Sequence, residues 1–395
     1  MPKKQDPKSW KLATKLVRGG TLRSNFGETS EAIFMNSGFC YDSAETAESR
    51  FNGSQPGFVY SRYSNPTLAM LESRLALMEG AERCTVMASG MAAVFAALMC
   101  QVKAGDHVLA SRVLFGSCWH IVTQILPRFG IEYTLVDGGD AKAWEKAFRK
   151  NTTAVFIETP ANPTLELVDI ALVAKLCKKQ GACLIVDNVF STPLLQSPLA
   201  LGADLVVYST TKHIDGHGRT LGGAVLGKAK FIDEVLLPFH RHTGPAMSPF
   251  NAWVLLKGLE SLPLRVERHC SNAQAIAEYL DGHPKIARVH YPGLKSFPQH
   301  ALAKKQMGGG GPMIAFEVKG GKKEAFRFMN KLATIDISNN LGDAKSLITH
   351  PASSTHANID AKERVKLGIG ESLLRLSVGI EDAGDLLADI KQALG

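Results

Sequence analysis

The chain has 395 residues, of which 45% are hydrophobic and 21% are charged, and its formal net charge is +8. This length suggests about two to three domains at roughly 150 residues each, and the composition excludes a disordered or fibrous protein. The lysines and arginines are scattered and form no block interleaved with aromatic residues, so we do not expect nucleic acid as a partner.

The cysteines and the apolar segments favour a cytoplasmic protein that does not enter a membrane. The seven cysteines form no Cys-x-x-Cys pair, which excludes a disulfide framework and a zinc-finger site. The first residues carry positive charge but lack the apolar core of a secretory signal. The segment 84–102 has no charged residue, but Ser89-Gly90 interrupts it. We expect a buried strand, a turn and a helix there rather than a membrane span.

Short apolar strands alternate with helices after an N-terminal stretch that has little periodicity. Residues 1–60 are predicted to form an extended arm that docks on a neighbouring subunit. Pro66 then opens a helix that Gly80 ends. Strands follow at 84–89, 107–111, 131–137, 153–160, 182–188, 204–209 and 222–227, with helices at 90–100, 116–130 and 166–181 between them. Strands of this kind separated by helices predict a mostly parallel sheet covered on both faces.

The pattern becomes looser after a long helical stretch from Pro249 to Leu280. Strands are expected at 313–318 and 373–380, with helices at 323–333 and at the C-terminus. We interpret 61–260 as an α/β cofactor domain and 261–395 as a smaller α+β domain.

Residues that could contact a ligand follow several strands of the predicted sheet, at the edge where such sheets bind ligands. They are Ser89, Gly90 and Met91 at a helix start, Glu158 and Asn162, Asp187, and Ser209, Thr211 and Lys212. A helix N-terminus binds phosphate through free amides, and nearby hydroxyls add donors. A lysine can form a Schiff base with an aldehyde, and a carboxylate can keep a ring nitrogen protonated. Together these groups indicate pyridoxal 5'-phosphate.

Two weaker hypotheses about this ligand site stay open. An α/β protein could bind another anion at the same edge, and a binding or regulatory protein could keep the fold without the chemistry. His213 and His217 are four residues apart, but they lie in a glycine-rich loop without a third ligand, so we expect no metal site.

A series of motifs, in chain order, extends these observations over most of the sequence. They are YSRYSNPT (60–67), ASGMAA (88–93), ETPANPT (158–164), VDN (186–188), STTKH (209–213) and RLSVGIED (375–382). In these motifs the chain resembles the pyridoxal-phosphate enzymes of Cys/Met metabolism that are related to cystathionine γ-synthase. The resemblance runs from about Gly19 to the C-terminus. It implies the fold of aspartate aminotransferase (fold type I), with a large, mostly parallel α/β domain and a smaller C-terminal domain.

The resemblance also implies roles for individual residues. Lys212 would be the catalytic residue and would link to the cofactor, and Asp187 would pair with the ring nitrogen. Arg375 would bind the substrate's α-carboxylate through its guanidinium fork. The other cofactor contacts would be Asn162 at the ring hydroxyl, Phe115 stacked on the ring, Gly90, Met91, Ser209 and Thr211 at the phosphate, and Tyr60 and Arg62 at the phosphate of the neighbouring subunit.

The sequence departs from the family pattern at a few positions. Phe115 stands where most members have Tyr, Asn340 where a Ser is usual, and Arg219 where Asp is common. We expect Asn340 and Arg219 to contact the substrate, and Arg219 to help select a succinyl ester. Ser117 stands where methionine γ-lyases have a reactive Cys, which argues against that activity.

Two segments, 209–223 and 337–356, look most like those of the O-succinylhomoserine sulfhydrylase branch of the family. The resemblance therefore implies γ-replacement in methionine biosynthesis, from O-succinylhomoserine and sulfide to homocysteine and succinate. The alternatives are cystathionine γ-synthase, with cysteine as the nucleophile, and O-acetylhomoserine sulfhydrylase. The expected partners are these small-molecule substrates and further copies of the chain, in a homotetramer built as a dimer of dimers.

Overall fold

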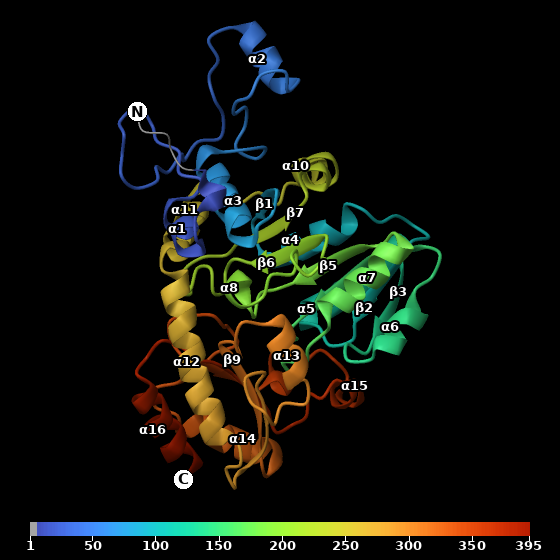
Figure 1. Ribbon diagram of the computed structural model, residues 1–395, viewed down its shortest axis with the longest axis vertical. Coiled ribbons are helices and arrows are strands. Elements are labelled where there is room, and N and C mark those ends of the chain that lie inside the picture. Colours follow the sequence, from blue (N-terminus) through green and yellow to red (C-terminus); the bar gives the residue numbers. More distant parts are fainter. Residues whose placement is uncertain (1–5) are drawn as a thin grey trace.

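The computed structural model describes residues 6–395, which fold around two β-sheets (Figure 1). The larger sheet has seven strands in the order β1-β7-β6-β5-β4-β2-β3. Strands β3, β2, β4, β5 and β6 pair in parallel, whereas β7 is antiparallel to both β6 and β1. The predicted mostly parallel sheet is confirmed. The strand bounds are β1 Arg83–Met87, β2 His107–Ser111, β3 Glu132–Val136, β4 Thr152–Glu158, β5 Cys183–Asp187, β6 Leu205–Ser209 and β7 Gly223–Gly227.

Helices cover both faces of this sheet, as the alternation of residues along β6 shows. Leu205 and Val207 belong to an apolar core with α4 and α5. Val206 and Tyr208 point to the other face and pack in a core with α3 and α11. The helices of this part are α3 Pro66–Glu79, α4 Gly90–Met99, α5 Gly116–His120, α6 Ala141–Ala147, α7 Ile170–Gln180, α8 Thr192–Leu195, α9 Ala229–Phe231, α10 Leu237–Thr243 and α11 Pro249–Glu260.

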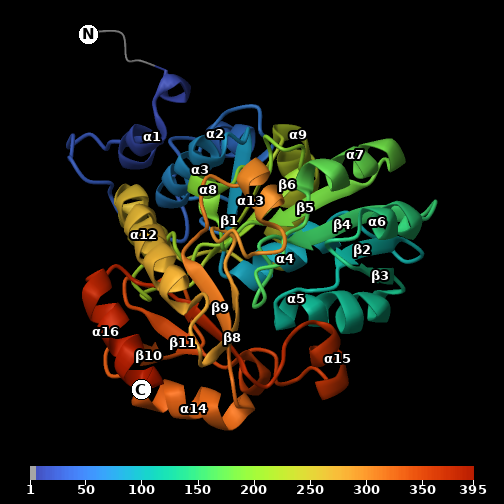
Figure 2. The ribbon, with the colours of Figure 1, turned by 60° about the horizontal axis from the view of Figure 1, so that its bottom comes forward.

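The C-terminal part has its own sheet and its own core. Five strands lie in the order β10-β11-β12-β9-β8, and helices α12, α14 and α16 pack against them (Figure 2). The bounds are β8 Ile286–His290, β9 Met313–Val318, β10 Asp336–Ile337, β11 Leu347–Thr349, β12 Leu373–Ser377, α12 Leu262–Leu280, α13 His300–Gln306, α14 Gly321–Lys331, α15 Ala361–Lys366 and α16 Ala383–Leu394. A separate apolar cluster joins the two parts through residues such as Val113, Phe190 and Leu341.

The N-terminal segment is more structured than the predicted extended arm. It contains helices α1 Leu12–Arg18 and α2 Ala44–Phe51. Helix α1 buries Leu16 in the core with α3 and α11, because Leu12 and Leu16 lie on one helical face. Helix α2 has no buried residue, and Figure 1 shows it projecting from the body of the molecule. The segment around α2 therefore finds little of its packing within the chain.

The structure adds two findings on membranes and disulfides. Across residues 6–395, no helix has both the length and the apolar content that crossing a membrane would require. The cysteines are free thiols, and most of them are buried or half-buried.

Candidate active site

A cavity of about 590 Å³ lies at the carboxyl ends of β4, β5 and β6. The loop 339–341 and β12 of the C-terminal part bound its other side. Thus the two parts of the chain build the cavity together. It brings together most of the residues predicted for the site, namely Gly90, Met91, Phe115, Asn162, Asp187, Ser209, Thr211, Lys212, Asn340 and Arg375.

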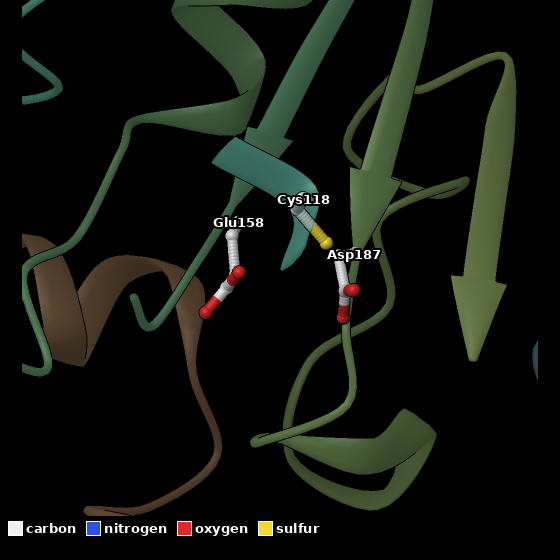
Figure 3. A group of neighbouring side chains, drawn as sticks. All are labelled: Cys118, Glu158 and Asp187. Atoms are coloured by element: carbon white, nitrogen blue, oxygen red, sulfur yellow. The ribbon is translucent and has the colours of Figure 1, made fainter. Parts of the chain in front are cut away.

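Two carboxyl groups lie side by side at the base of the cavity, because β4 and β5 pair with Glu158 directly opposite Asp187. Cys118 of α5 completes this group. Its sulfur and one carboxyl oxygen from each of the two acids lie within 4.8 Å of one another (Figure 3). Burial raises the pKa of Asp187, and burial followed by the charge of Asp187 raises the pKa of Glu158. A cation at this position would favour the ionised form of Asp187.

Lys212 follows β6 and reaches into the cavity. Its Nζ donates a hydrogen bond of 2.6 Å to Oδ1 of Asn340. Burial, and secondly the nearby Arg375, lower the pKa of Lys212 to about 8. The ammonium therefore gives up its proton more readily than that of an ordinary surface lysine.

Arg375 of β12 is 1% exposed and is held at several points. Its Nη1 donates to Oδ1 of Asn162 at 3.0 Å, and its Nη2 donates to the backbone carbonyls of Asn339 and Asn340. Burial lowers its pKa to about 10, so it stays a cation at neutral pH. Its Nε is buried and has no hydrogen-bond partner among residues 6–395, which leaves this N–H for an anionic ligand.

Close backbone packing forms an anion cradle at the start of α4. Ser89 caps this helix by accepting a hydrogen bond from the amide of Ala92. A Cβ atom on Gly90 would lie 2.6 Å from Cβ of Ser209, so only glycine lets the helix approach the hydroxyl of Ser209. Thr211 lines the same wall. The amides at the helix start and the hydroxyl of Ser209 suit a phosphate group, whereas the hydroxyl of Thr211 is hydrogen-bonded to the backbone of Gly222.

These features are the ones that pyridoxal phosphate requires. The cradle at α4 fits its phosphate, the paired carboxyls fit a ring cation, and Lys212 fits its aldehyde. The Nε of Arg375, which has no partner among the described residues, leaves a donor for a further anionic group such as a carboxylate.

Three predicted residues do not reach the cavity. Tyr60 and Arg62 line a different hollow with Met35 and Met247. Arg219 is engaged by Asp215, which accepts hydrogen bonds from its backbone amide and its Nε at 2.6 and 2.9 Å. Its side chain is 42% exposed. Selection of a succinyl ester by Arg219 therefore stays a prediction, and it would require this contact to open.

The cavity also contains residues for which no individual role is predicted. They are Val94, Cys118, Val189, Phe190, Leu221, Asn339, Leu341 and Thr355, together with Ser89 and Glu158, which were expected only at the ligand-binding edge of the sheet. Glu158 was visible as a strand end, and Cys118 lies three residues after Phe115, which places both on one side of a helical turn. Asn339 and Thr355 belong to the segment 337–356 that carried part of the resemblance.

Comparison with characterised sequences agrees with this geometry. A family model for the Cys/Met metabolism PLP-dependent enzymes matches residues 13–395. The O-succinylhomoserine sulfhydrylase of Mycobacterium tuberculosis is 53% identical over 386 residues, which are 97% of this chain and 95% of that protein. The O-succinylhomoserine sulfhydrylase of Pseudomonas aeruginosa is 47% identical over 381 residues, 96% and 94% of the two chains.

Solved structures give the same result. The structure of metB from Corynebacterium glutamicum superposes with a TM-score of 0.93 at 37% identity and covers 98% of this chain and 99% of that one. A putative O-acetylhomoserine (thiol)-lyase from Campylobacter jejuni, which carries N'-pyridoxyl-lysine-5'-monophosphate, has a TM-score of 0.94 at 34% identity over 98% and 100%. The chain therefore belongs to the Cys/Met metabolism family of pyridoxal-phosphate-dependent enzymes.

Proposed function

We propose that the protein is an O-succinylhomoserine sulfhydrylase, which converts O-succinylhomoserine and sulfide to homocysteine and succinate. The observation that carries the proposal is the convergence of Lys212, Asp187 and Arg375 on one cavity, in a chain 53% identical to an enzyme of that name. The product would serve methionine biosynthesis, in the cytoplasm.

The site residues divide the work of handling the cofactor. When bound, pyridoxal phosphate supplies an aldehyde that captures the substrate amine and a protonated ring that withdraws electrons from the α-carbon. Asp187 would hold the proton on the ring nitrogen, since an adjacent negative charge favours the cation. Ser209, Thr211 and the start of α4 would hold the phosphate.

Lys212 is the base of the reaction. Its pKa of about 8 leaves part of the amine neutral near neutral pH, as a general base requires. From its position beside Asn340, Nζ would take the proton from the α-carbon of the substrate and would then move protons at the β-carbon. One amine that serves several proton transfers explains why the cavity needs few other titratable groups.

Arg375 would orient the substrate through its α-carboxylate, using the Nε that has no partner within residues 6–395. With the amine and the carboxylate of the α-carbon both held, the C–O bond at the γ-carbon breaks and succinate leaves as a carboxylate. Such a leaving group needs little acid catalysis. Sulfide then forms the new C–S bond at the γ-carbon, and homocysteine results.

The test is a product assay with each pairing of ester and nucleophile. O-Succinylhomoserine and O-acetylhomoserine are each supplied with sulfide and with cysteine, and kcat/KM is measured for homocysteine and for cystathionine. We expect the pairing of O-succinylhomoserine with sulfide to be the fastest. Faster formation of cystathionine would instead identify a cystathionine γ-synthase, and a preference for the acetyl ester would identify an O-acetylhomoserine sulfhydrylase.

We also propose that the enzyme is a homotetramer, a dimer of dimers in which neighbouring subunits complete each other's sites. Tyr60 and Arg62 line a hollow away from their own cavity, and the nearby α2 has no buried residue. Docking of this segment on a partner would bury its apolar side chains and bring Arg62 to the partner's phosphate.

A further inference from the structure

One buried carboxyl group joins two segments that lie on either side of it in the sequence. Glu158 ends β4 and is 5% exposed. Its Oε2 accepts a hydrogen bond of 2.8 Å from the backbone amide of Phe115, and its Oε1 accepts one of 2.6 Å from the backbone amide of Asn162. The first amide precedes α5, and the second lies in the loop after β4. The side chain thus fixes two backbone segments with one group.

Both segments present side chains to the cofactor cavity. Phe115 lines it and is the candidate stacking residue, while Asn162 lines it and accepts a hydrogen bond from Arg375. Arg375 in turn donates to the backbone carbonyl of Asn340, whose side chain receives the hydrogen bond from Lys212. A displacement of the Glu158 carboxyl would therefore move the ring wall directly and the substrate end through this series of contacts.

The buried position of Glu158 is unfavourable for a carboxyl group unless hydrogen bonds stabilise it there. It is a second acidic group buried within 4.8 Å of Asp187 and Cys118 (Figure 3). Burying such a group costs free energy that must be offset by good hydrogen bonds. The two amide donors and the positive charge of Arg375 offset part of this cost.

We propose that Glu158 is a positioning residue, which sets the placement of the cofactor ring by fixing the backbone of Phe115 and of Asn162. The proposal rests on the proposed cofactor placement but not on the identity of the substrates. Asp187 and Glu158 then have different tasks, although they lie side by side: Asp187 would contact the ring, whereas Glu158 holds the frame around it.

The test uses Glu158→Gln in the holoenzyme without substrate. Glutamine has the same shape, but it can accept from only one of the two amides and turns its NH2 group toward the other. We expect the visible circular-dichroism band of the bound cofactor to weaken relative to its absorbance, and the cofactor's dissociation constant to rise at least about tenfold, as when a buried amide loses its acceptor. Melting by far-ultraviolet circular dichroism verifies that the variant folds.

Glu166→Gln is the matched control. Glu166 is a half-buried carboxyl group in the loop that follows β4, and its Oε1 lies close to Gly138, but it lines a different cavity. This control should keep the wild-type band and affinity. Equal weakening in Glu158→Gln and Glu166→Gln would overturn the proposal, and so would a wild-type band and affinity in Glu158→Gln.

A double-mutant cycle tests whether Glu158 acts through Phe115. Phe115→Leu removes the aromatic face but keeps the backbone amide. If Glu158 acts in part through Phe115, the fold-change in cofactor affinity for the double variant will be smaller than the product of the single changes. A simple product would show that the two residues act independently, against the proposal. These readouts involve no ester or sulfide, so they stand even if the proposed reaction fails.

Discussion

Lys212 is the one lysine, among the residues that the structure describes, that lines the cofactor cavity. We expect the purified protein to be yellow, and borohydride to fix the cofactor on Lys212, which peptide mapping locates. Lys212→Ala should lose nearly all turnover, because the general base is removed. Lys345 is an exposed lysine a few residues after the cavity loop 339–341, and Lys345→Ala should stay active. A reduced adduct on any other lysine would refute the assignment.

Asp187 provides a second prediction for a single residue. Asp187→Asn keeps the shape of the side chain but removes the charge that would hold the ring nitrogen protonated. We expect kcat to fall at least about a hundredfold, while the fold persists. Asp204→Asn is a suitable control, since Asp204 accepts a hydrogen bond from the backbone of Leu184 at the other end of the sheet. Near-normal turnover of Asp187→Asn would mean that the carboxylate is only structural.

A buried polar contact between α3 and β6 should make stability depend on pH. Tyr208 donates a hydrogen bond of 2.6 Å to Oε2 of Glu79, and burial raises the pKa of Glu79 to about 8. A raised carboxyl pKa means that the folded state binds more protons than the unfolded state between about pH 4.5 and 8. The stability that Glu79 contributes is therefore present below about pH 4.5 and is lost as the pH rises through 8.

Glu79→Gln tests this dependence, because glutamine stays neutral at every pH. We expect the difference in unfolding free energy between the variant and the wild type to shift in favour of the variant by at least about 1 kcal/mol from pH 5 to pH 8.5. One pKa unit corresponds to about 1.4 kcal/mol. Melting temperatures at several pH values measure the change. A constant difference between the two proteins across this range would contradict the raised pKa. Glu260→Gln, at a half-buried surface ion pair, serves as the control.

The elements that the sequence predicted best are those with strong periodicity and marked ends. Helix α3 begins at Pro66 and ends before Gly80, which has a left-handed φ of 75°. Helix α7 begins at Ile170 rather than at 166, because the side chain of Asp169 caps it. Strand β8 was not predicted, since its burial pattern leaves Ala287 and Arg288 exposed between the buried Ile286 and Val289. Alternation over so few residues is a weak signal.

In the site, too, features that depend on local sequence were predictable, whereas contacts between segments distant in the sequence were not. The residues at strand ends, such as Asp187 and Lys212, were predictable because parallel strands bring their carboxyl ends to one edge. The bridge from Glu158 to Phe115 and Asn162 was not, because it depends on how the segment before α5 and the loop after β4 close over one carboxyl. The engagement of Arg219 by Asp215 likewise depends on the fold of a glycine-rich loop.

At the scale of the whole molecule, the N-terminal segment leaves several large apolar side chains exposed in the single chain. Phe26 is 96% exposed, Met35 66% and Phe51 65%, although large apolar side chains usually gain from burial. Arg62 is hydrogen-bonded to the backbone carbonyl of Arg241 and lies outside its own cofactor cavity. These facts support the proposal that the segment completes a partner's site.

A subunit-mixing experiment tests the shared site. Arg62→Ala and Lys212→Ala should each be nearly inactive as pure assemblies. In a mixed dimer, one site would combine both defects, and the other would have an intact Lys212 from one chain and an intact Arg62 from its partner. Unfolding the two variants together and reassembling them should therefore restore activity. Random pairing makes about half of the dimers mixed, so about a quarter of the sites, and of the wild-type activity, should return.

The control and the opposite outcome follow from the same geometry. Lys212→Ala and Asp187→Asn each alter the cavity of the subunit that carries the change. Mixing these two variants should give no rescue, because no pairing creates an intact cavity. If Arg62 served the cavity of its own subunit, its mixture with Lys212→Ala would behave like this control. Native mass spectrometry verifies that mixed oligomers are present. A verified mixed oligomer without activity would show that each subunit carries a complete site, and α2 would then need another reason to be so exposed.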